Sequence, residues 1–377
     1  MSDSAPFAQL CKLGRLFEVQ AWLNSDRETD HSFDLGGRKD PLVIAVDKGF
    51  HSLAQVLLKG GFTISEQAFS LAVWRRRLDI VELFFQFGAP VDLIPFSEVV
   101  ETTDKDMVHF FIEEGADFKT GWPLAIGLKR APKLFCGIHK RYVGEHPDLK
   151  FQAEIALQQL CAENKMRGVC LMLWLGADPR VAVPDFRYTD ECDDEELWIT
   201  SLRTAAWHGH LEIVKKLEPN QELDDLNDLL YQSAYSRNVD LMAYLIQCGA
   251  DPNAAHEEGQ SLVAHLFHLL DWSLDPCFAF RCSDDRWGSK TKKCLELLIE
   301  NGLQWEPKDG REFTAIRKPL YRMTPDEMLK WLNLIRRFSK EPEAVLKRIL
   351  STPKMKRLLD LQNWSSTRFC RFLDRRR

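Results

Sequence analysis

The chain has 377 residues, of which 45% are hydrophobic and 28% are charged. This composition excludes an intrinsically disordered or collagen-like chain and predicts a globular protein. The formal net charge is −6, but the charges are unevenly distributed along the chain. Residues 308–377 contain 19 Lys+Arg and 8 Asp+Glu, whereas residues 1–307 contain 31 Lys+Arg and 48 Asp+Glu. Such segregated charge predicts attraction of oppositely charged partners, or pairing of the basic end with the acidic remainder of the chain.

The compartment is predicted from what the sequence lacks. No segment approaches the ~18 consecutive apolar residues of a membrane-spanning helix, and the first residues lack the apolar core of a secretory signal. The ten cysteines show no spacing typical of a disulfide framework. We therefore expect a protein of a reducing compartment, cytoplasmic or nuclear, with no membrane association.

One phrase recurs along the chain: small or apolar residues, a short turn, an apolar helix and a closing glycine. In chain order, its clearest copies cover residues 45–61, 72–90, 163–179, 202–217 and 234–253. The closing glycines are Gly61, Gly88, Gly115, Gly176 and Gly249. A glycine there ends a helix, because it enters the left-handed region without Cβ strain. A repeated helical unit predicts an all-α solenoid in which each unit packs on its neighbours.

The best copy carries a family resemblance. Residues 202–217, LRTAAWHGHLEIVKKL, resemble the Leu-x-x-Ala-Ala-x-x-Gly-His-Leu-Glu-Val-Val-Lys phrase of ankyrin-repeat proteins. Weaker matches extend the resemblance over roughly residues 5–305, as about eight or nine degenerate repeats within a predicted domain of residues 1–305. It implies antiparallel helix pairs with Gly209–His210 in the turn between them. It also implies a non-catalytic scaffold that recognises a partner protein through its first helices and loops.

The chain departs from the family pattern in three segments and at its end. Two repeat intervals are 27 residues long, shorter than the usual ~33. Segments near 129–150, 180–197 and 271–293 are predicted as insertions at the edges of the array, where binding loops often lie. Residues 306–377 lack the phrase and are predicted as a basic helical C-terminal region. That region either caps the array or recruits a second protein, for example ubiquitin-ligase machinery.

One helix is predicted in detail within that region. It covers residues 325–338, with Thr324 as its N-cap and Pro325 at its first position. Apolar residues at helical spacing would form one stripe along it. The stripe consists of Met328, Leu329, Leu332, Ile335 and Phe338.

Candidate partner-binding residues lie just before and within the turns of the repeats. Aligned on the paired small residues, Trp74, Trp207 and Tyr235 share one position. Trp, Tyr and Arg dominate the energetics of protein interfaces. The full candidate set is Trp74, Arg75, Arg76, Trp207, His208, Tyr235 and Arg237. The alternative, that the rings fill space between neighbouring first helices, stays open.

Charge suggests the character of the partner. Residues 185–196 carry seven carboxylates, and five more follow at Glu218, Glu222, Asp224, Asp225 and Asp228. These residues form either solvated loops or an edge that attracts a basic protein. Nucleic acid is disfavoured there, and is expected only through the basic C-terminal segment.

No cofactor, metal or catalytic residue is predicted. A structural zinc site is one interpretation of Cys277 and Cys282, with Cys294 beyond them and His265 and His268 upstream. Structural zinc sites usually show two tight ligand pairs, however, and only one loose pair is present here. The sequence has no P-loop and no GxGxxG, GxSxG or HExxH motif. An enzyme whose site is built from the insertions is the remaining alternative.

Overall fold

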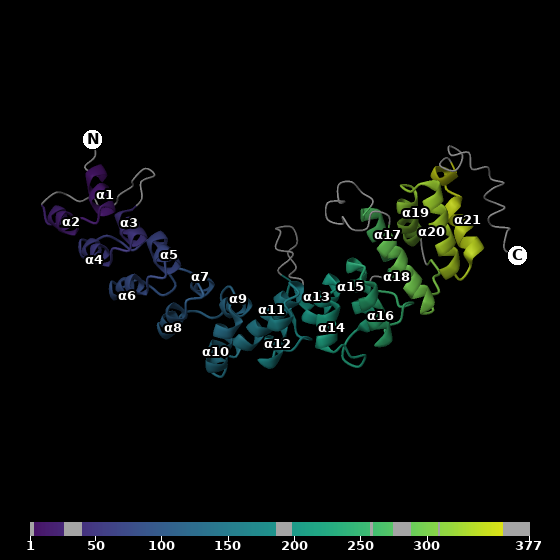
Figure 1. Ribbon diagram of the computed structural model, residues 1–377, viewed down its shortest axis with the longest axis horizontal. Helices are drawn as coiled ribbons and strands as arrows, with labels where there is room; N and C mark the ends of the chain where they lie inside the picture. The colour runs from purple at the N-terminus through teal and green to yellow at the C-terminus, as the bar shows by residue number, and fades with distance from the viewer. Residues whose placement is uncertain are drawn as a thin grey trace. The chain divides into compact units, whose positions relative to one another are not determined.

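The computed structural model describes residues 4–25, 40–185, 198–256, 259–273, 288–307 and 310–356. Within these residues the regular structure consists of helices α1 to α21 and one pair of short strands (Figure 1). The chain divides into two compact units. Unit 1 comprises residues 1–157 and 170–178, and unit 2 comprises residues 158–169 and 179–377. Helices α11 (Asp148–Ala162) and α12 (Met166–Trp174) contribute residues to both units.

Unit 1 is a stack of helix pairs. Its first helices, α1, α3, α5, α7 and α9, each contact the next, and they lie along one side of the unit in Figure 1. The second helices lie along the other side. The pairs are α1 Ser4–Lys12 and α2 Leu16–Leu23, α3 Pro41–Lys48 and α4 His51–Lys59, α5 Glu66–Trp74 and α6 Leu78–Gln86, α7 Phe96–Glu101 and α8 Lys105–Glu113, α9 Pro123–Arg130 and α10 Pro132–Tyr142.

Unit 2 repeats the arrangement. Its first helices α13, α15 and α17 contact one another in order, and α17 contacts α19. Among the second helices, α16 contacts α18, and α18 contacts α20. The helices are α13 Ser201–His208, α14 Leu211–Leu217, α15 Leu226–Ser236, α16 Val239–Gln247, α17 Leu262–Ser273, α18 Ser289–Glu300, α19 Gly310–Leu320, α20 Pro325–Phe338 and α21 Pro342–Leu350. The fold is thus all-α, a helical solenoid of the ankyrin type.

Left-handed residues mark the repeat register. The turn within most pairs contains one, either a glycine such as Gly49 or Gly209, or a larger residue such as Arg76 or Arg237, whereas Ala131 between α9 and α10 has φ −135°. Glycines also close five second helices at the predicted positions. Their φ values are 89° at Gly61, 82° at Gly88, 87° at Gly115, 90° at Gly176 and 115° at Gly249. The turn residue within the pair and the closing glycine therefore define the repeat together with its apolar residues.

The predicted insertions have different structures. Within 129–150, residues 132–142 form α10, which packs on α9 as the second helix of a regular pair. Helices α9 and α10 lie so close that a Cβ on Gly127 would meet the Phe135 ring at 2.5 Å. Within 180–197, strand β1 (Ala182–Pro184) pairs antiparallel with strand β2 (Trp198–Thr200), which follows the segment, and Val183 lies opposite Ile199. Most of 271–293 lies outside the described residues, and α18 begins at Ser289.

The helix predicted at 325–338 is α20. Thr324 caps it in a reciprocal arrangement with Glu327, which accepts hydrogen bonds from the Thr324 backbone N–H and hydroxyl. Met328, Leu332, Ile335 and Phe338 of its apolar stripe are buried, and Leu329 is half-buried. This helix contacts α18 and α21 within unit 2. A separate C-terminal module remains a prediction.

Candidate partner-binding surface

In unit 1 the predicted residues tie α5 to the neighbouring first helices. Trp74, 49% exposed at the end of α5, donates its indole N–H to Glu98 Oε1 of α7 at 2.6 Å. Arg75 Nη2 pairs with Asp47 Oδ1 of α3 at 2.7 Å. Arg76 takes the left-handed turn conformation, and its Nη2 donates to the Thr102 carbonyl at 2.7 Å. Exposed pairs of this kind contribute about 0–1 kcal/mol each, so their main effect is to fix side-chain positions.

In unit 2 the equivalent position is aromatic. Trp207 of α13 and Tyr235 of α15 are stacked, with ring centroids 3.6 Å apart and planes 19° apart. Tyr235 in turn meets the edge of His265 of α17, at 4.6 Å and 66°. Trp207 and Tyr235 are both half-buried. The rings therefore fill the space between first helices and still present part of their surface to solvent.

The stack of rings continues beyond the residues that were predicted from the sequence. Tyr231 lies between the rings of His256 and His265, with both centroid separations at 4.1 Å. Tyr231 also donates its hydroxyl to Gln260 Oε1 at 2.9 Å. The signal available in the sequence was the four-residue spacing of Tyr231 and Tyr235, which places both on one face of a helix. We call the five rings the aromatic row: Trp207, Tyr235, His265, Tyr231 and His256.

The two remaining predicted residues differ in accessibility. His208 is exposed, and its ring lies parallel to that of His210 at 5.7 Å. Arg237, in contrast, is 8% exposed, and its Nη2 donates to the Leu269 carbonyl at 3.1 Å. The guanidinium thus joins the turn after α15 to α17, which does not fit the predicted role of Arg237 in contacting a partner.

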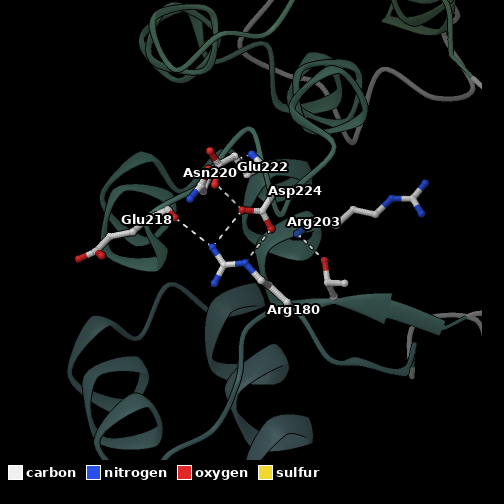
Figure 2. A network of polar contacts seen from close by, with 7 residues as sticks. Arg180, Arg203, Glu218, Asn220, Glu222 and Asp224 are labelled. Carbon is white, nitrogen blue, oxygen red and sulfur yellow. Dashed lines mark hydrogen bonds and ion pairs between the residues drawn. The ribbon is translucent and has the colours of Figure 1, made fainter.

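The acidic middle of the chain is partly neutralised by its own arginines. Arg180, just before β1, donates to both carboxylate oxygens of Asp224 at 3.1 and 3.0 Å and to the Glu218 carbonyl at 3.2 Å (Figure 2). The Asn220 backbone N–H donates to the same carboxylate at 2.8 Å. The predicted negative surface is consequently weaker than the count of acidic residues implied.

Asp228, at the end of the aromatic row, lies beside Arg203 and His256. Arg203 Nε lies 3.2 Å from its Oδ2, and His256 Nε2 lies 3.4 Å from its Oδ1. Glu218 and Glu222, in contrast, are exposed. Residues 186–196 of the acidic run lie outside the described residues.

Among the cavities in the described part of unit 2, two lie beside α17. The larger, of about 590 Å³, lies among loops before α17 and α19 and is lined in part by Trp305, Glu306 and Lys340. Lys340 Nζ lies 3.6 Å from Glu306 Oε2 at its rim. The smaller, of about 370 Å³, lies between α17 and α19.

Of the three cysteines considered as zinc ligands, only one lies within the described residues. Cys294 is buried in α18, and Cys277 and Cys282 lie outside the described residues. Within the part of the chain that the structure describes, no three His, Cys, Asp or Glu side chains converge as metal ligands. Among the same residues, no helix is both long and apolar enough to cross a membrane.

Comparisons with known proteins give limited similarity. No protein-family model matches the sequence. The chain is 26% identical over 224 residues to alpha-latrocrustotoxin-Lt1a of Latrodectus tredecimguttatus, covering 52% of this chain and 15% of the toxin. This chain thus spans a small part of the toxin's length. The crystal structure of the ankyrin repeat domain of Bcl-3 is similar at 17% identity, with 68% of this chain and 92% of that domain covered and a TM-score of 0.28. That score is too low to support the fold, which rests on the helix pairing described above.

Proposed function

We propose that the protein is a non-catalytic scaffold that recognises a partner protein through the first-helix surface of unit 2. The observation that carries this proposal is the aromatic row. Its stacked Trp207 and Tyr235 rings are held in place by neighbouring repeats and remain partly accessible. Side chains that are ordered before binding lose little entropy when a partner arrives, and aromatic anchors of this kind dominate interface energetics.

The partner is proposed to bind around His208, Trp207 and Tyr235. Arg75 and Arg76 of unit 1 are engaged with Asp47 and Thr102 and are less suited to new contacts. A basic partner would be attracted by the exposed carboxylates of the loops, among them Glu218 and Glu222. An adaptor role for the C-terminal region has less support, because the apolar stripe of α20 is largely buried within unit 2.

The test is affinity capture with the full chain as bait, followed by measurement of the dissociation constant for the purified partner. A Trp207→Ala/Tyr235→Ala variant is compared with Trp174→Ala, which removes a tryptophan of α12 that is 63% exposed in unit 1. The proposal predicts that the double variant loses the partner and that Trp174→Ala retains it. Equal retention by both variants would contradict the proposal.

A further inference from the structure

The exposed side of α10 forms a basic patch on unit 1. Lys133, Gly137, Lys140 and Arg141 are exposed, and their spacings of three, four, seven and eight residues place them on one side of the helix. The helix contains no Asp or Glu. Trp174 of α12, which is 63% exposed, adjoins this side, with Lys140 Nζ 3.3 Å from the centroid of its ring. We call these five residues the α10 face.

The cations of the α10 face are not neutralised by the residues that the structure describes. Lys133 and Arg141 form no ion pair with any of those residues, and Lys140 contacts an indole ring rather than a carboxylate. Arg130, at the end of α9, is in contrast paired with Glu101, with Nη2 3.3 Å from Oε2. The α10 face therefore holds three positive charges that can pair with an acidic ligand.

Gly137 indicates that another backbone approaches this face. Glycine in a helix interior is less favourable than alanine, and Gly137 lies near the middle of α10. Packing within the described chain does not require it, because a Cβ there would have no heavy atom within 4 Å. Gly127 of α9 is different, since a Cβ there would meet the Phe135 ring. An exposed glycine without such a neighbour suits close contact with a segment of another protein.

We propose that the α10 face binds an acidic α-helix of a second partner protein, at a site separate from the aromatic row. Lys133 and Lys140 lie seven residues apart, roughly 10 Å along the helix axis. A helix packed alongside α10 can pair with both through two carboxylates that are also seven residues apart. Gly137, between them, leaves room for the backbone of that helix. The Trp174 indole N–H has no hydrogen-bond partner among the described residues and can donate to the carboxylate at Lys140.

An extended polyanion, such as a nucleic acid or an acidic membrane surface, suits the patch less well. Glu113 and Glu114, both exposed, lie at the end of α8, the preceding second helix. The whole chain also has a net charge of −6. A polyanion that extends past α10 would be repelled by these charges, whereas a single helix can lie along α10 alone.

The test is a selection from a phage-displayed library of alanine-rich helical peptides. Glu, Gln, Lys and Leu vary along one helix face, the full chain is the target, and Lys133→Glu/Lys140→Glu is the counter-target. The proposal predicts enrichment of peptides with two Glu seven residues apart. In the selected peptide, moving one Glu two positions to the opposite face keeps the net charge and should weaken binding at least tenfold, measured by fluorescence anisotropy.

Variants of the chain make the test specific. Lys133→Glu/Lys140→Glu and Trp174→Ala should each weaken binding of the selected peptide at least tenfold. Lys59→Glu, at an exposed position on α4, should leave it unchanged. Gly137→Gln should weaken binding tenfold and yet raise the melting temperature, because glutamine is the better helix former. That combination separates a blocked site from a misfolded chain.

Three results would overturn the proposal. They are enrichment without paired Glu, full binding by Gly137→Gln, and selective loss of single-stranded DNA or phosphatidylserine vesicles, rather than of acidic peptides, in Lys133→Glu/Lys140→Glu. The Trp207→Ala/Tyr235→Ala variant should bind the selected peptide as the natural chain does. Failure at the α10 face is therefore distinguishable from failure of the proposed function.

Discussion

At the scale of single residues, His265 shows how closely the aromatic row is packed. Its side chain is 3% exposed and contacts both Tyr231 and Tyr235. Burial, with smaller contributions from the charges of His268 and His256, lowers the pKa of His265 from 6.5 to about 3. The ring is therefore neutral in the folded protein at pH 7, and protonation opposes the packing of α15 on α17.

His265 should make unfolding depend on pH. Its folded pKa lies below its unfolded value, so the unfolded chain takes up a proton below pH 6.5 that the folded chain does not. Stability is consequently lost as the pH falls from 6.5 towards 3, by about 2 kcal/mol at pH 5. Denaturant titrations at pH 7 and pH 5 should show this loss in the natural chain. The loss should be smaller in His265→Gln, and an equal loss in both chains would contradict the assignment.

The cysteines should differ widely in reactivity. Burial raises the pKa of the Cys161 thiol to about 12, and burial together with the negative charge of Asp40 does the same for Cys11. Cys170 is exposed. Because the thiolate is the nucleophile, native alkylation followed by peptide mass spectrometry should label Cys170 before Cys161 and Cys11. Cys161 should react about a thousandfold more slowly, and labelling of both at similar rates would contradict the packing around α11.

At the scale of elements, the turns within helix pairs determine how closely neighbouring repeats approach. Gly209 has φ 75°, and a Cβ there would lie 2.5 Å from Ser236 Cβ in the following repeat. Gly88, which closes α6 with φ 82°, has no neighbouring heavy atom within 4 Å of the place that a Cβ would take. Both glycines relieve backbone strain, but only Gly209 also permits close contact between repeats.

Gly209→Ala should therefore destabilise the protein more than Gly88→Ala. The strain of a left-handed alanine costs roughly 1–2 kcal/mol at either site. Displacement of the Ser236 segment should add about 1–3 kcal/mol at Gly209 alone. Chemical denaturation of the two variants measures the difference, and equal destabilisation would show that the repeats can separate without cost.

The sequence predicted some of these elements better than others. The closing glycines, the cap at Thr324 and the equivalent repeat positions of Trp207 and Tyr235 follow from local patterns, which a sequence displays directly. Helix α10 was missed because no glycine closes it and its basic residues resemble a loop. The burial of Arg237 depends on the Leu269 carbonyl, 32 residues away, and no local pattern indicates such a contact.

At the scale of the whole molecule, the repeats of the two units present different surfaces on one scaffold. The first helices of unit 1 are joined by polar pairs such as Arg75–Asp47 and Arg130–Glu101. Those of unit 2 are joined by stacked rings. Since charged pairs at a surface contribute little and aromatic anchors contribute much, we propose unit 2 as the recognition surface.

Recognition of a partner through the aromatic row is tested by calorimetry. The dissociation constant of the captured partner is measured for the natural chain, for Trp207→Ala/Tyr235→Ala and for Trp174→Ala. Two anchor residues of about 2 kcal/mol each predict a loss of affinity of at least a hundredfold in the double variant. Trp174→Ala should bind within twofold of the natural chain. An unchanged dissociation constant in the double variant, with its fold intact, would show that the aromatic row serves packing alone.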